Sequence, residues 1–205
     1  TRACELAPTE PAYFFQRGRL HARRGEADLA SKDLEQTLRL DPDHVDALLV
    51  RAGMRLGTQQ ADAALEDLAR ADKAAPQGDG VRLTLAGLYV KAGRPEAAVQ
   101  QFSQWIDAHR DDAQLAQALD GRCWARSLVG RELPAALKDC NQALRLRPEA
   151  ADFLDSRALA YLRLGNYDRA IADYDAALKR DPRNAWSLYG RGIARLRKGQ
   201  AAAGQ

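Results

Sequence analysis

The sequence has few of the residues that usually mark a catalytic, metal-binding or membrane-spanning protein. Its 205 residues include only three cysteines, three histidines and one methionine, and aromatic residues make up 6%. No segment approaches the ~20 consecutive apolar residues of a transmembrane helix, so we expect no membrane insertion. The net charge of +3 is too small to predict binding to nucleic acid.

The histidines and cysteines are not spaced as metal ligands. His21, His44 and His109 lie far apart in the sequence, and neither Cys-x-x-Cys nor His-x-x-x-His occurs. A Cys–His nucleophile would need His109 beside Cys123 and a third group to orient it, and the sequence positions no such group. No glycine-rich phosphate loop follows a strand, because no strand is expected. We therefore expect no active site, metal or cofactor in this chain.

What the chain does contain is a repeat of 34 residues. Pro8, Pro42 and Pro76 share this spacing, as do Pro148 and Pro182. Small residues recur in step with them, first as Ala30, Ala64, Ala98, Ala136 and Ala170, and then as Gly18, Ala52, Ala86, Cys123, Ala158 and Gly192. Repetition at this period indicates stacked supersecondary units.

The phase of the repeat slips by four residues between the third and fourth units. We place three extra residues near Asp112–Gln114 and one in the turn Gly130–Leu133. The remaining positions keep their spacing on both sides of the slip.

Each unit is predicted to be a helix, a turn and a second helix. In 151–184 apolar residues recur at helical spacing, Gly165 ends the first helix, and Asp181-Pro182 ends the second. The predicted hairpins are 11–44, 45–78, 79–115, 116–150 and 151–184, followed by a lone helix at about 185–198.

The two ends of the chain follow the same phase. Thr1–Ala7 is predicted to be the end of a second helix from a preceding repeat, which occupies 1–10, and Gly199–Gln205 is predicted to begin another second helix in a partial repeat, 185–205. Stacked hairpins need capping units, so we expect a fragment of a longer protein. Frayed native termini are the alternative.

This pattern resembles the tetratricopeptide repeat (TPR), which combines a period of 34 residues with small residues in both helices and a closing proline. The resemblance covers nearly the whole chain. The third unit departs from it, because Arg110 replaces the proline and Trp105 replaces a small residue. The resemblance implies an all-α fold, a right-handed α-solenoid of stacked antiparallel hairpins, with 1–205 forming a single TPR array.

Four short stretches are also similar to the repeat region that follows retropepsin-like aspartic protease domains in some bacterial proteins. They are Gly121-Arg122-Cys123-Trp124, Lys138-Asp139-Cys140-Asn141, Leu154-Asp155-Ser156-Arg157 and 186–192. This similarity implies an exported protease upstream of Thr1. The chain itself lacks the Asp-Thr/Ser-Gly loop that such an enzyme needs.

Charged residues also follow the repeat. Arginine precedes the small residue of the first helix at Arg17, Arg51, Arg122, Arg157 and Arg191, and aspartate follows the key alanine of the second helix at Asp33, Asp67, Asp139 and Asp173. The third unit has Leu85 and Gln101 instead, so the two charges disappear together. This pattern predicts Arg–Asp contacts within hairpins. An arginine ladder for nucleic acid would not explain the aspartates.

Cys123 and Cys140 occupy facing positions of the fourth hairpin. The two positions lie at similar height in an antiparallel pair, so a structural disulfide is plausible. It would indicate an oxidising compartment such as the periplasm. The alternative is two buried free thiols in a cytoplasmic protein. Cys4 is then unpaired within the chain or bonded upstream.

The TPR resemblance implies that first helices line a concave groove. In this sequence the expected partner groove consists of Phe15, Arg19, Leu49, Gly53, Leu56, Leu83, Gly87, Val90, Trp124, Leu128, Asp155, Leu159, Leu162, Tyr189, Ile193 and Leu196. Most of these residues are apolar, which favours binding of a helix or an extended peptide. Some of them could instead only pack between repeats. Arg19, Gly53 and Leu83 do not match the Lys/Asn/Arg clamp by which some TPR domains hold chaperone tails.

Two functions remain open at this point. The first is a scaffold that binds another polypeptide, or the rest of its own chain, in the apolar groove. The second is an accessory domain of an exported bacterial aspartic protease that presents substrate or positions the protease. A β-rich upstream region would favour the second, and further helical repeats would favour the first.

Overall fold

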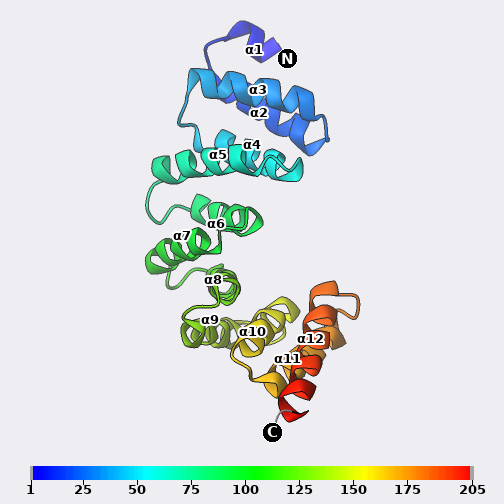
Figure 1. The fold of residues 1–205 in the computed structure, drawn as a ribbon. Helices are drawn as coiled ribbons and strands as arrows, with labels where there is room; N and C mark the ends of the chain where they lie inside the picture. Colours follow the sequence, from blue (N-terminus) through cyan, green and yellow to red (C-terminus); the bar gives the residue numbers. More distant parts are fainter. Residues whose placement is uncertain (1, 204–205) are drawn as a thin grey trace. The chain divides into compact units, whose positions relative to one another are not determined.

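The computed structural model describes residues 2–203, and over this range it contains twelve helices and no strand. By their internal contacts they form two compact units, Thr1–Arg94 and Pro95–Gln205. Figure 1 shows the helices following one another through short turns. Each unit is a stack of antiparallel hairpins, so the expected all-α solenoid fold class is confirmed.

The first unit contains α1 to α6. Helix α2 packs against α3 and α4 against α5, and α4 also contacts α2 and α6. The first helices of successive hairpins therefore lie side by side. The bounds are α1 Arg2–Leu6, α2 Pro11–Arg23, α3 Ala27–Leu40, α4 Val45–Gly57, α5 Ala61–Ala74 and α6 Val81–Lys91.

The second unit contains α7 to α12 and repeats this arrangement. Helix α8 packs against α7 and α9, α10 packs against α11, and α10 contacts both α8 and α12. The bounds are α7 Pro95–Ala108, α8 Leu115–Val129, α9 Leu133–Leu146, α10 Ala151–Arg163, α11 Tyr167–Arg180 and α12 Ala185–Ala203. The boundary between the units falls inside the predicted hairpin 79–115, so a single array over 1–205 stays a prediction.

The small residues of the repeat form the contact between paired helices. The key alanines of the second helices, from Ala30 to Ala170, are fully buried, as are Ala52, Ala86 and Ala158. A Cβ added at Gly18 would lie 3.0 Å from the Cβ of Asp33. Close approach of the two helices therefore requires a small residue here.

The turns within the hairpins share one backbone conformation. Gly25, Gly93 and Gly165 have φ of 73°, 69° and 75°, and Gln59 adopts φ 59° at the equivalent place. The expected ending of the first helix at Gly165 is confirmed. In the fourth hairpin Gly130 and Glu132 both have positive φ. This second left-handed residue marks the extra residue expected in the turn Gly130–Leu133.

The tail of the chain differs from the prediction. Helix α12 is continuous from Ala185 to Ala203, whereas a break near Gly199 was expected. The alanines at 201–203 have the highest helix propensity, and one interior glycine costs about 1 kcal/mol without ending a helix by itself. Residues 204 and 205 lie outside the described part. Whether α1 ends a preceding repeat stays a prediction.

Candidate binding surface

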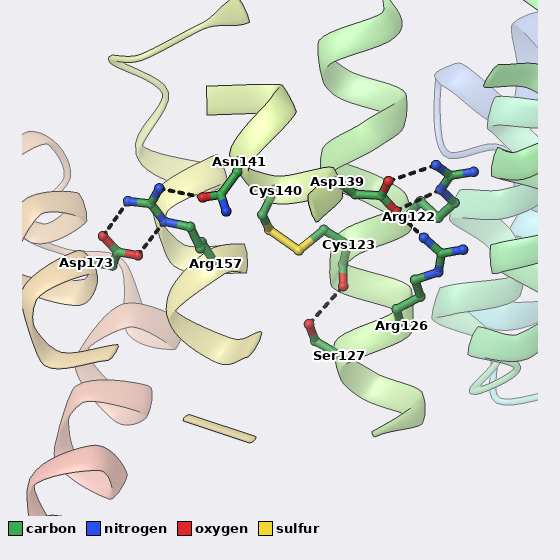
Figure 2. The surroundings of a disulfide bond; sticks show 9 residues. All are labelled: Arg122, Cys123, Arg126, Ser127, Asp139, Cys140, Asn141, Arg157 and Asp173. Atoms are coloured by element: carbon green, nitrogen blue, oxygen red, sulfur yellow. Dashed lines mark hydrogen bonds and ion pairs between the residues drawn. A yellow bond between two sulfur atoms is a disulfide. The ribbon is translucent and has the colours of Figure 1, made fainter. Parts of the chain in front are cut away.

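The four predicted Arg–Asp pairs are present. Each joins the first helix to the second helix of one hairpin, and in each the guanidinium donates two hydrogen bonds to the carboxylate (Figure 2 shows two of the pairs). The N–O distances are 2.6 Å for Arg17–Asp33, 2.6 Å for Arg51–Asp67, 2.8 Å for Arg122–Asp139 and 2.7 Å for Arg157–Asp173. All four aspartates are buried.

Sequence reasoning missed a second arginine on two of these aspartates. Arg55 lies 2.7 Å from Asp67, and Arg126 lies 2.5 Å from Asp139. Both follow the first arginine by four residues, one helical turn, which places the two side chains on one face. This spacing of four residues could have predicted the second arginine.

Some arginines also reach the preceding second helix. Arg122 donates to the Ser103 hydroxyl at 3.2 Å. Arg157 donates to the Asn141 amide oxygen at 2.9 Å (Figure 2). Arg191 pairs at 2.6 Å with Asp175. These guanidiniums bind side chains within and between hairpins, so they help to hold the helices together.

Cys123 and Cys140 are joined by a disulfide between α8 and α9, with Cα atoms 5.5 Å apart (Figure 2). Both cysteines are fully buried beside Ala136 and Ala160. The bond thus links the small residue of the first helix to the second helix, as the facing positions suggested. Cys4, on α1, is buried.

The residues expected in the groove divide by burial. Three of them, Phe15, Leu49 and Asp155, are 5%, 6% and 7% exposed and therefore contribute to packing instead of an open surface. Phe15 contacts the ring of His44, with centroids 4.7 Å apart. Phe15, Leu49 and Asp155 each stand three residues before the small residue of their helix. This position faces the neighbouring first helix, a contact that the sequence does not reveal.

The other expected residues keep some exposure. Two are open, Tyr189 at 68% and Leu196 at 58%. The rest are half-buried, and they are Arg19, Gly53, Leu56, Leu83, Gly87, Val90, Trp124, Leu128, Leu159, Leu162 and Ile193. Those from Arg19 to Val90 belong to the first unit, and those from Trp124 onward belong to the second.

The second unit exposes an aromatic group that the sequence indicated only in part. Trp124 on α8 meets Trp186 on α12 edge to face, with ring centroids 6.3 Å apart. Trp186 is 69% exposed. We call the surface formed by α8, α10 and α12 the first-helix face of unit 2. The repeat pattern did not indicate Trp186, because no other first helix has a tryptophan at the equivalent position.

Two buried aspartates lie on this first-helix face. Asp155 accepts a hydrogen bond of 2.5 Å from the Ser187 hydroxyl, and burial raises its pKa. The pKa of Asp120 is raised to about 8, chiefly because the carboxyl is buried; a hydrogen bond with Ser156 opposes the shift, and nearby Asp152 and Asp155 contribute to it. Asp120 was missed, although it stands three residues before Cys123 just as Asp155 stands three before Ala158.

One oxygen of Asp120 is unsatisfied. Its Oδ1 is buried and has no hydrogen-bond partner among the described residues. A buried polar atom without a partner is unusual in a folded protein. Within residues 2–200, no three His, Cys, Asp or Glu side chains gather as a metal site would.

Three family models match the chain, all of them for tetratricopeptide repeats. They cover residues 15–79, 55–120 and 158–199. The chain belongs to the tetratricopeptide repeat family. In this TPR chain, none of the described helices is long and apolar enough to cross a bilayer.

The TPR chain is similar to several known proteins at low identity. DnaJ homolog subfamily C member 3 of Gallus gallus is 22% identical over 85% of the chain, which spans only 30% of that relative. The structure of YrrB, described as a TPR protein with an unusual peptide-binding site, has a TM-score of 0.72 at 18% identity and covers 93% of this chain and 96% of its own. The structure of a TPR protein from Parabacteroides merdae has a TM-score of 0.73 at 16% identity. The match covers 94% of this chain and 75% of that protein. Identities this low show a shared fold.

Proposed function

We propose that this TPR chain is a scaffold that binds a segment of another polypeptide on the surfaces formed by its first helices. The single observation that carries the proposal is the aromatic pair of Trp124 on α8 and Trp186 on α12, in which Trp186 is 69% exposed. Aromatic side chains are enriched where proteins bind one another.

The engagement of the arginines supports this proposal over nucleic-acid binding. Arg17, Arg51, Arg122 and Arg157 each pair with a buried aspartate of the same hairpin. Phosphate binding would have to break these pairs and leave buried carboxylates without a cation. YrrB, whose fold this chain shares, is described as having a peptide-binding site, so the fold is compatible with the role.

The experiment is selection from a random peptide library on the intact chain, followed by affinity measurements on the selected peptides. We expect Tyr189→Ala and Trp124→Ala to weaken binding about tenfold or more. Circular dichroism should remain unchanged for Tyr189→Ala, whose side chain is open to solvent.

Tyr13→Ala is the matched control, because Tyr13 is also an exposed tyrosine, at 45%, on the first helix α2. It should bind as the unmodified chain does. Failure to select any peptide would contradict the proposal, as would equal losses in Tyr13→Ala and Tyr189→Ala.

We further propose that the chain works in an oxidising compartment, as an exported protein. The disulfide between Cys123 and Cys140 supports this, since such bonds are rare in the cytosol. Alkylation of denatured, unreduced protein from its native source should leave Cys123 and Cys140 unmodified. Modification of Cys123 and Cys140 would contradict the proposal and favour a cytoplasmic scaffold. The role as an accessory domain of an exported aspartic protease stays a prediction.

A further inference from the structure

A cavity of about 420 Å³ lies among α7, α8 and α9 in unit 2. This volume is in the range of pockets that hold small organic molecules. One wall consists of four α8 residues that recur at helical spacing, Leu115, Leu119, Arg122 and Arg126. Trp124 stands two residues from each of the two arginines, about 200° around the helix. The cavity therefore lies on the side of α8 that is turned away from the Trp124–Trp186 pair.

Most of the charged side chains that line the cavity are cations. The four cations are Arg110, Arg122, Arg126 and Lys138, and the two carboxylates are Asp107 and Asp139, so the lining carries a net charge of +2. Arg110 and Lys138 are exposed and form no ion pair with any described residue. The cavity therefore has cations that the fold does not neutralise.

Asp139 leaves part of the hydrogen-bonding capacity of its two arginines unused. Arg122 donates to it twice, whereas Arg126 donates to it once, from Nη1 (Figure 2). The Nε of Arg126 is buried without a hydrogen-bond partner, and its Nη2 donates to no residue in the described part of the chain. Glu132 lies 3.8 Å from this Nε, but it is 71% exposed and does not line the cavity. One buried carboxylate thus serves two guanidiniums.

The equivalent place in the second hairpin is built differently. There Arg70 reaches across from α5 and donates to the carbonyl oxygen of Pro42. Around the cavity, Arg110 stands at the repeat position of Pro42, and Lys138 stands at that of Glu66. Both departures from the repeat add positive charge at the cavity. Stacking of hairpins does not require these two cations, because the second hairpin forms without them.

The remaining part of the lining is apolar. Ile106, Leu115 and Leu119 line the cavity and are 8%, 9% and 2% exposed. A cavity with an apolar wall and a few convergent polar groups fits an organic molecule better than an inorganic ion. The net charge of +2 is matched by a phosphate monoester, which carries nearly two negative charges at pH 7.

We propose that this cavity binds a small organic phosphate monoester. Arg110, Lys138 and the unused Nη2 of Arg126 hold the phosphate by charge and hydrogen bonds. The organic part of the ligand lies against the apolar wall. The Arg122–Asp139 pair stays intact, because the phosphate needs none of its hydrogen bonds. This site goes beyond the binding of a polypeptide, since it lies on the other side of α8 from Trp124.

The test is calorimetry on the intact chain at pH 7.5 and low salt with three probes: phenyl phosphate, inorganic phosphate and benzoate. Phenyl phosphate combines the doubly charged group with a ring, and each of the other probes lacks one of these features. We expect phenyl phosphate to bind about tenfold or more tighter than either. Excess inorganic phosphate should displace it.

Two variants locate the site. Arg110→Gln and Lys138→Gln should each weaken the binding of phenyl phosphate about fivefold. Circular dichroism should not change, because neither side chain is paired in the fold. Lys32→Gln is the matched control, since Lys32 is exposed and precedes Asp33 as Lys138 precedes Asp139. It should bind phenyl phosphate as the unmodified chain does.

Three results would overturn this proposal. They are no measurable binding of phenyl phosphate at millimolar concentration, equal affinity for phenyl phosphate and either other probe, and a loss in Lys32→Gln as large as that in Lys138→Gln. None of these results bears on the capture of a peptide at Trp124 and Trp186. The two proposals therefore fail separately.

Discussion

At the scale of single residues, the partner of each buried aspartate decides what that aspartate does. Arginine partners neutralise Asp33, Asp67, Asp139 and Asp173, and this arrangement repeats from hairpin to hairpin. Asp120 stands apart, with a serine partner and one unsatisfied oxygen. The first kind fixes the packing of two helices, and the second kind keeps its proton up to about pH 8.

The arginine pairs predict strong coupling in stability. Asp67→Asn removes the partner of both Arg51 and Arg55, so it should destabilise the chain by roughly 3–5 kcal/mol. In the double-mutant cycle with Arg51→Leu, the coupling free energy from urea unfolding should be about 1–3 kcal/mol.

The exposed pair Arg180–Glu149 is the control for that cycle. It should show coupling of about 0–1 kcal/mol, because solvent screens the charges. Strictly additive effects at Arg51 and Asp67 would show that the pair does not act as a unit.

Asp120 predicts a fall in stability with rising pH. Below the ordinary pKa of 3.8 the Asp120 carboxyl is protonated in both the folded and the unfolded chain. Between pH 3.8 and about 8 the unfolded chain has lost this proton, while the folded chain keeps it. The free energy of unfolding should therefore decrease over this range and then level off.

Thermal unfolding of the intact chain and of Asp120→Asn across this pH range measures the effect. The decline should be shallower in Asp120→Asn, because the amide does not ionise, while Asp46→Asn should follow the unmodified chain. Parallel curves for all three proteins would rule out a raised pKa at Asp120.

At the scale of secondary-structure elements, each hairpin depends on a turn with a left-handed residue. Gly25, Gly93 and Gly165 provide it without strain, and Gln59 adopts φ 59° at the same place. A side chain in this conformation is strained, and glycine is not. The second hairpin is therefore less favourable at its turn than its neighbours.

Gln59→Gly should stabilise the chain by about 0.5–1 kcal/mol, the strain relief outweighing the extra freedom of the unfolded chain. Urea unfolding midpoints measure the change. Gln60→Gly is the control, since Gln60 has φ −91° and gains nothing from glycine. A loss of stability in Gln59→Gly would show that the turn is unstrained.

The fourth hairpin carries an additional covalent link. The disulfide spans 17 residues of sequence, and in the chain-entropy model it contributes about 3 kcal/mol. A reducing agent should lower the urea midpoint of the intact chain accordingly. The double variant Cys123→Ala, Cys140→Ala should not respond to the reducing agent; an equal response in that variant would assign the effect to something other than this bond.

At the scale of the whole molecule, the sequence determines the repeats better than the working surface. The period placed the hairpins, and the joint loss of charges at Leu85 and Gln101 predicted the Arg–Asp pairs. Periodicity reports which residues share a helix face, and it does not report how far a neighbouring helix covers them. For that reason Phe15, Leu49 and Asp155 were assigned to the groove although they are buried.

The same limit explains the residues that were missed. Asp120 and Trp186 gain their importance from neighbours on other helices, namely Ser156 on α10 and Trp124 on α8. Such neighbours are separated by tens of residues in the sequence, and repeat spacing alone does not pair them. Residue spacing predicted the contacts within a repeat. The contacts between repeats were visible only in the three-dimensional structure.

The most direct test of the central claim is a hydrogen-exchange footprint of a selected peptide on the intact chain. Binding on the first-helix face predicts slower exchange in the first helices α8, α10 and α12, with α9 and α11 unchanged. Protection of α9 and α11 in place of the first helices would contradict the account, because it would put the partner on the opposite side of the hairpins.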